Sequence, residues 1–221
     1  MQLTNILSLL FIAGSTLAAP GGVTITISNN CQKAIQVNQL TNGASHQDSA
    51  TSLSAGGSKS YSVSSTWGGR FWGRDHCSSG SSDCESGSPA SLAEFLLKGS
   101  GGKDFYDVSF VDGYNMPISI KPHAGGNGDC GKPACNKLPE CSEDFQVKDS
   151  NGKMIGCKSA CSALNTDEAC CRGEYNSPEK CKSSHFATNV KSSCPDVYSY
   201  AYDDPTSTFT CTATGYDVTF C

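Results

Sequence analysis

Fourteen cysteines, an even number, constrain this chain of 221 residues more than any other feature. Cys-x-x-Cys pairs are absent, and the four histidines are scattered without the spacing of zinc ligands. In an oxidising compartment, cysteines in a chain of this size pair as disulfides. We therefore expect seven disulfides, no free thiol and no metal site, with zinc as the alternative. The adjacent Cys170 and Cys171 should not bond to each other and should instead tie one segment in two directions.

The first residues predict export. The apolar segment from Ile6 to Ala13 is too short to span a bilayer, and small residues follow it up to Ala18. This pattern is typical of a secretory signal peptide over residues 1–18, although its start lacks Lys and Arg, and a membrane anchor is the alternative. We expect a secreted, extracellular monomer without a membrane anchor, formed by a single domain over residues 19–221.

Charge and motifs narrow the classes of function. The chain carries 16 Lys and Arg against 21 Asp and Glu, a net charge of −5, which makes nucleic acid and anionic membranes poor partners. The letters G-x-G-x-x-G occur at residues 126–131, but Pro122 precedes them and Pro133 follows, where a nucleotide site needs a strand and a helix. We expect no cofactor. Because a G-x-S-x-G elbow is also absent and the thiols are oxidised, carboxylates remain as candidate catalytic groups.

Alternating apolar and polar residues predict a sandwich or barrel of antiparallel strands. Val23, Ile25 and Ile27 fall on one face of the first strand, and Gly, Asn, Ser and Pro turns separate the later runs. The segment "SPASLAEFLLKG" fits a helix capped by Ser91 and Glu94 or a strand equally well. The further strand candidates are "AIQVNQL", "SKSYSVSS", "GRFWGR", "FYDVSFVDG", "MPISIKP", "STFTCTA" and "YDVTFC".

Residues 130–194 differ in character from the rest of the chain. They carry nine of the cysteines and few β-branched runs, so we expect a disulfide-rich subdomain that depends on its cross-links. Within it, "TDEACCRGEY" predicts a short helix with Thr166 or Asp167 as its cap. A bond between Cys31 and Cys221 would close nearly the whole chain.

Acidic residues lie in or beside aromatic segments, a combination that suits sugars. Glycoside hydrolysis uses two carboxyl groups roughly 5 to 10 Å apart, and aromatic faces stack on the apolar edges of sugar rings. The alternative is that the aromatics are core and the acids are surface groups. Asp107 and Asp112 would point to opposite faces of one regular strand, so they share a cleft only if the chain bends at Asp112-Gly113. The candidate aromatics are Trp67, Phe71, Trp72, Tyr106, Tyr114, Tyr198, Tyr200 and Tyr202.

Longer motifs resemble, in order and spacing, those of the thaumatin-like (pathogenesis-related) proteins: "RFWGRDHC", "SLAEFLL", "FYDVSFVDGYNMPISI", "CKSAC", "ACCRGEY" and "CPDVYSYAYDDPTSTFTC". The resemblance spans almost all of residues 22–221. It implies a mainly β fold, a flattened antiparallel β-sandwich with disulfide-rich loops. One departure is the loop "CSSGSSDCESGSPA", which keeps two cysteines where the family usually has four and so implies seven bonds instead of eight.

The resemblance, and not the spacing, implies the pairing of the cysteines. Fourteen cysteines allow on the order of a hundred thousand pairings. The implied bonds are Cys31–Cys221, Cys77–Cys84, Cys130–Cys211, Cys135–Cys194, Cys141–Cys157, Cys161–Cys170 and Cys171–Cys181.

The resemblance also implies a cleft lined by one Arg, one Glu and three Asp. By motif, these are Arg70, Glu94, Asp107 and Asp112, with the last Asp at Asp203, or alternatively at Asp204 or Asp196. Family members are associated with binding β-1,3-glucan and some with weak endo-β-1,3-glucanase activity. We expect Glu94 as the proton donor, Asp107 as base or nucleophile, and Arg70, Asp112, Asp203 and Asp204 as substrate-binding residues.

Three functions follow as hypotheses from the resemblance. The first is a secreted β-1,3-glucan-binding protein with slow or no cleavage and antifungal or cell-wall activity. The second is a non-catalytic defence or glycosidase-inhibitor protein that acts through protein or wall binding. The third is a structural wall component. Sweet-receptor binding, known for the family's namesake, is disfavoured because this chain is acidic.

Overall fold

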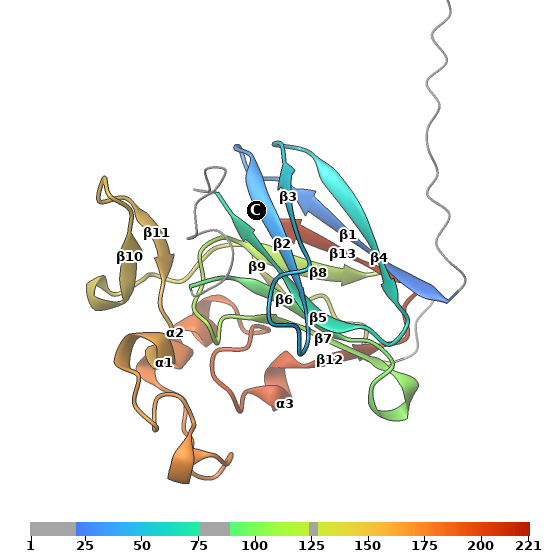
Figure 1. The fold of residues 1–221 in the computed structure, drawn as a ribbon. Helices are drawn as coiled ribbons and strands as arrows, with labels where there is room; N and C mark the ends of the chain where they lie inside the picture. The colour runs from blue at the N-terminus through green and yellow to red at the C-terminus, as the bar shows by residue number, and fades with distance from the viewer. Residues whose placement is uncertain (1–20, 76–88, 124–127) are drawn as a thin grey trace, which may run out of the picture.

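The computed structural model describes residues 21–75, 89–123 and 128–221, so the predicted signal peptide and the predicted Cys77–Cys84 bond lie outside the described residues. Two sheets form a mainly β sandwich, as predicted (Figure 1). The first sheet has the strand order β4 (Ser58–Ser64), β1 (Gly22–Asn29), β13 (Gly215–Phe220), β8 (Ile118–Pro122) and β9 (Ala134–Cys135). The second has the order β12 (Phe209–Cys211), β7 (Asp104–Ser109), β6 (Leu92–Leu96), β5 (Gly68–Arg74), β2 (Ile35–Thr41) and β3 (Ser49–Leu53).

The core lies between the two sheets and follows from the alternation of each strand. In β7, Tyr106 and Val108 are fully buried, whereas Asp107 between them lies on the opposite face and is only partly buried. The same alternation holds in β1, where Ile25 and Ile27 are fully buried. The face of the second sheet turned away from this core is therefore free to carry polar groups.

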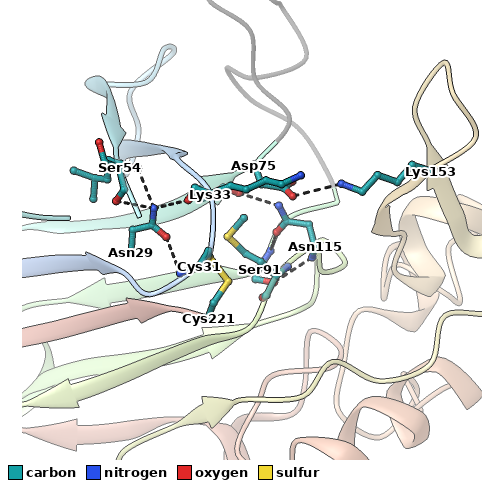
Figure 2. The surroundings of a disulfide bond; sticks show 12 residues. Asn29, Cys31, Lys33, Ser54, Asp75, Ser91, Asn115, Lys153 and Cys221 are labelled. Carbon is teal, nitrogen blue, oxygen red and sulfur yellow. Dashed lines mark hydrogen bonds and ion pairs between the residues drawn. A yellow bond between two sulfur atoms is a disulfide. The ribbon is translucent and has the colours of Figure 1, made fainter. Parts of the chain in front are cut away.

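The first and last strands pair in parallel, which is the exception to the otherwise antiparallel pairing of β1, β4, β8 and β13. The Cys31–Cys221 disulfide follows directly on both strands, with a Cα–Cα distance of 5.0 Å, as the family resemblance implied. Figure 2 shows Asn29 beside this bond. Its buried side-chain amide donates to the carbonyls of Lys33, Leu53 and Ser54, and its oxygen accepts from the amide of Cys31. Every polar group of Asn29 is thus satisfied, which holds this turn in place.

The segment for which helix and strand were equally defensible is the strand β6. Ser91 does not cap a helix: its buried hydroxyl donates to the Met116 carbonyl at 2.6 Å and accepts from the amides of Asn115 and Met116. The side chain of Asn115 reciprocates by accepting from the Ser91 amide (Figure 2). These bonds fix the start of β6, and with it the position of Glu94 two residues into the strand.

The disulfide-rich part of the chain lies beside the sheets (Figure 1). It contains η3 (Glu143–Phe145), the hairpin β10 (Gln146–Lys148) and β11 (Met154–Cys157), α1 (Ala160–Leu164), η4 (Gly173–Tyr175) and α2 (His185–Ser193). Two short elements lie elsewhere in the chain, η2 (Ser100–Gly102) and α3 (Asp204–Ser207). Among the described residues, no helix is long and apolar enough to cross a membrane.

Six of the implied disulfides are present, and no cysteine in the described part of the chain is free. Cys170 bonds to Cys161 and Cys171 to Cys181, so the adjacent pair does tie one segment in two directions. The helix predicted at residues 166–175 is wrong. That segment is a turn followed by η4, and the Thr166 hydroxyl caps the turn by accepting from the Ala169 amide. The remaining four disulfides are Cys31–Cys221, Cys130–Cys211, Cys135–Cys194 and Cys141–Cys157.

Candidate acidic site

Three of the predicted site residues form one row across neighbouring strands of the second sheet. Arg70 in β5 lies directly opposite Glu94 in β6, and Glu94 lies directly opposite Asp107 in β7. Directly opposed residues on adjacent antiparallel strands have Cβ atoms about 4.5 to 5.5 Å apart and point to the same face. The register alone therefore places a cation and two carboxyl groups side by side on one face of the sheet.

Asp112 joins this row because the chain bends, as the Asp112-Gly113 dipeptide predicts. Gly113 adopts a φ of +93°, and a Cβ at this position would lie 2.2 Å from the Cys157 carbonyl oxygen. Its amide donates to the Phe110 carbonyl and closes the turn. The bend brings an Asp112 carboxylate oxygen to 3.5 Å from the Arg70 guanidinium. Without the bend, Asp107 and Asp112 would point to opposite faces of the strand, because they are an odd number of residues apart.

A pocket of about 270 Å³ opens over this row. Its charged lining consists of Arg70, Glu94, Asp107 and Asp112, three acids and one base. A second pocket, also of about 270 Å³, adjoins it on the side of the disulfide-rich part. The acidic pocket is completed by Leu92, Ser109, Val111, Tyr198 and Ala201.

Burial changes the protonation of the two opposed acids. It raises the pKa of Asp107 well above its ordinary value, and the negative charges of Glu94 and Asp204 raise it further. Burial also raises the pKa of Glu94, with Asp112 adding to the effect, but the positive charge of Arg70 and a hydrogen bond from Ser109 oppose it. One Asp107 oxygen has no hydrogen-bond partner in the described part of the chain. Between them, the two acids hold a proton more readily than free carboxyl groups do.

The expectation that Glu94 is the proton donor stays a prediction, because the pKa of both acids is raised. The Arg70 guanidinium and the Ser109 hydroxyl both favour the ionised form of Glu94, whereas Asp107 has Glu94 and Asp204 as negative neighbours. The pair is therefore best treated as a unit that supplies one proton and one carboxylate.

The acids predicted to complete the cleft do not line this pocket. Asp203 is buried, accepts from the Ser199 hydroxyl at 2.7 Å and pairs with Lys191 at 3.2 Å, so it fixes the 199–203 loop. Asp204 is exposed and accepts from the Tyr198 hydroxyl at 2.7 Å, close enough to influence the pKa of Asp107. Asp196 influences the pKa of Lys191.

Most of the candidate aromatics belong to the core, as the competing interpretation held. Tyr198 contributes a wall of the acidic pocket, where its hydroxyl contacts Asp204 and Thr208. Tyr200 lines the second pocket, and Tyr202 donates to Asn176. The five aromatics buried elsewhere are Trp67, Phe71, Trp72, Tyr106 and Tyr114.

The sequence interpretation named Tyr198 among the candidate aromatics but did not single out Ser109 as a site residue. The position of Ser109, two residues after Asp107 on the same strand face, was a usable signal. An isolated β-bridge between the backbones of Ser109 and Tyr198 places Tyr198 at the pocket, and this contact joins segments far apart in sequence. Within the described residues, no group of three or more His, Cys, Asp and Glu side chains could hold a metal ion.

The Asp107→Asn variant should be more stable than the wild type at neutral pH. A carboxyl group with a raised pKa binds its proton more tightly in the folded state, so wild-type stability falls as pH rises above the ordinary Asp value of 3.8. An amide has no charge to lose, and it can donate to the neighbouring Glu94 carboxylate. Urea denaturation at about pH 7 and about pH 3 measures the difference, which should be present at the higher pH and vanish at the lower.

The exposed Asp144, which lies far from this row in sequence and on η3, offers a matched control. We expect Asp144→Asn to change stability little at either pH. An Asp107→Asn variant that is less stable than the wild type at neutral pH would contradict the raised pKa.

The structure is a disulfide-linked β-sandwich with an acidic pocket on one sheet face, and sequence comparison identifies its family. The family described as the Thaumatin family matches residues 29–221. Thaumatin-like protein 1 of Pyrus pyrifolia is 41% identical over 244 aligned positions that cover 100% of both chains. The chain therefore belongs to the thaumatin family.

Two further comparisons concern proteins whose names mention β-1,3-glucan. A protein named Glucan endo-1,3-beta-glucosidase from Prunus avium is 38% identical and covers 93% of this chain and 94% of its own. The crystal structure of a GH family 64 laminaripentaose-producing beta-1,3-glucanase from Paenibacillus barengoltzii matches with a TM-score of 0.58 and 12% identity, covering 92% of this chain and 76% of that one. At this identity the second similarity shows the fold alone.

Proposed function

We propose that this thaumatin-like protein is secreted and binds β-1,3-glucan in the acidic pocket, where it hydrolyses the polymer slowly as an endoglucanase. The observation that carries the proposal is the cross-strand row of Arg70, Glu94 and Asp107, with Asp112 at its edge. The full-length similarity to a relative named as a glucan endo-1,3-beta-glucosidase supports the same substrate class. Cell-wall and antifungal activity would follow from this binding.

The chemistry needs one proton and one carboxylate, and the Glu94 and Asp107 pair supplies both. The protonated member donates to the leaving oxygen, and the ionised member acts as base or nucleophile at the sugar carbon. Arg70 lies 3.5 Å from Asp112, and its guanidinium carbon lies 5.9 Å from the centre of the Trp72 ring. With Asp112 and Trp72 as neighbours, the planar guanidinium of Arg70 can orient a sugar hydroxyl or a carboxylate.

Sedimentation with insoluble β-1,3-glucan, with cellulose as the control polymer, tests the proposed binding. We expect retention on the β-1,3-linked polymer and new reducing ends after prolonged incubation. Asp112→Ala should weaken retention by roughly three- to tenfold, because one hydrogen-bonding group at the pocket edge is lost. Asp144→Ala, which removes an exposed acid outside both pockets, should leave retention unchanged.

Each outcome of this assay distinguishes a different function. Retention without new reducing ends would remove the catalytic part and leave a glucan-binding protein. No retention on either polymer would overturn the proposal in favour of a defence or inhibitor protein that acts on a partner protein.

A further inference from the structure

We infer that the pocket lined by Tyr200 is a second sugar subsite, which takes further glucosyl units of the same β-1,3-glucan chain. This inference rests on the proposed function and names where the polymer runs beyond the acidic pocket. The two pockets share Val111, Asp112 and Ala201 in their linings, so they adjoin at Asp112. Each has a volume of about 270 Å³, and together they reach the range of small-molecule sites, roughly 300 to 1,000 Å³.

Disulfides and helix caps constrain the walls of this second pocket. The Cys161–Cys170 and Cys171–Cys181 bonds contribute to its lining. Ser159 and Ser184 begin α1 and α2 at the pocket and accept hydrogen bonds from helical backbone amides. A preformed cavity loses little conformational entropy when a sugar binds, which favours affinity.

Tyr200 lines this pocket without a ring partner or a side-chain hydrogen bond among the described residues. It is partly exposed, contacts no other aromatic ring, and its hydroxyl forms no hydrogen bond in the described part of the chain. The other two tyrosines of this segment form side-chain hydrogen bonds: the Tyr198 hydroxyl donates to Asp204 and the Tyr202 hydroxyl donates to Asn176. An unpartnered aromatic face at a pocket suits the apolar C–H edge of a sugar ring, while its hydroxyl can bond a sugar hydroxyl.

Two neighbours extend the same chemistry. The Leu164 side chain at the end of α1 is 59% exposed and adds an apolar surface to the pocket lining. The Ser183 hydroxyl, also in the lining, forms no hydrogen bond within the described residues and is available to a sugar. An apolar platform with a few free hydroxyl groups fits a neutral, hydroxyl-rich polymer.

Calorimetric titration with β-1,3-linked oligosaccharides of two lengths tests the inference. We expect a disaccharide to occupy the acidic pocket alone and a hexasaccharide to reach the second pocket as well. We expect Tyr200→Ala to weaken hexasaccharide binding by roughly three- to tenfold and disaccharide binding by less than about twofold. Tyr200→Phe should retain most of the hexasaccharide affinity because it keeps the ring.

Tyr202→Ala is the matched control, since Tyr202 is also a partly exposed tyrosine but lines neither pocket. It should leave both affinities near the wild-type values. Leu164→Ser provides an independent variant, which should also weaken hexasaccharide binding selectively, because an exposed side chain can be exchanged without harm to the fold.

Equal hexasaccharide affinity in the wild type and Tyr200→Ala would overturn the inference while leaving the proposed function intact. An equal loss for both ligands would also overturn it, because Tyr200 would then act through the acidic pocket. A wild-type protein that binds neither oligosaccharide would instead refute the proposed function itself, and the subsite with it.

Discussion

The Glu94→Gln and Asp107→Asn variants are each expected to release at least about 100-fold fewer new reducing ends from soluble β-1,3-glucan than the wild type. Proton transfer by a positioned carboxyl group contributes about 100- to 10,000-fold to such reactions. Glu94 and Asp107 lie directly opposite each other on β6 and β7, and burial raises the pKa of both carboxyl groups. Removing either member leaves the other without its partner in the reaction.

The readout is the initial rate of reducing-end formation at equal protein concentration, with Asp144→Asn as the control that keeps wild-type turnover. Both variants should still sediment with insoluble glucan, because an amide keeps the shape and hydrogen-bonding capacity of the carboxyl group. Turnover unchanged in both variants would contradict the assignment of this pair. Loss of turnover in only one would show that the two acids do not act as a unit.

Simultaneous replacement of Cys31 and Cys221 by serine is expected to lower the free energy of unfolding by about 5 kcal/mol. The bond links residues separated by 190 positions, and in the chain-entropy model the stabilisation grows with the length of the closed loop. Urea denaturation followed by circular dichroism measures the loss. A decrease this large would leave little of the stability of an ordinary domain.

The Cys161–Cys170 bond supplies the matched control, since it closes a loop of only 9 positions. Replacing this pair by serine should cost roughly half as much as replacing the long-range pair. Equal losses from the two double variants would contradict the entropic account, and so would a greater loss from the short loop.

Strand alternation allowed much of the sandwich to be predicted from the sequence. In β7, alternation separates Tyr106 and Val108, which face the core, from Asp107, which faces the acidic pocket. The bend at Asp112-Gly113 was also readable, because glycine tolerates the positive φ found there. Such features depend on neighbouring residues, which is why a local pattern reveals them.

Pairing between distant segments could not be read in the same way. The row of Arg70, Glu94 and Asp107 depends on the register between three strands, and no local pattern specifies which residues face each other. The family resemblance supplied these residues together. It also supplied Asp203, whose hydrogen bonds with Ser199 and ion pair with Lys191 depend on the loop and α2.

The helix α2 was missed although its sequence carries a usable signal. Ser184 caps it by accepting from the Ala187 amide, and Phe186 and Val190 are buried four residues apart. The surrounding cysteines and polar residues suggested loops, and the helix contributes only nine residues. A cap followed by apolar residues at helical spacing would have identified it.

The parallel pairing of β1 with β13 has a consequence for biosynthesis. A ribosome releases β1 long before β13, and about 190 residues of intervening chain must be made before the two can meet. The centre of the first sheet therefore assembles only after translation is nearly finished, and the nascent chain exposes an unpaired strand edge for most of that time. Maturation of this protein should accordingly depend on chaperones and on oxidation catalysts that act late, when the two ends first become neighbours.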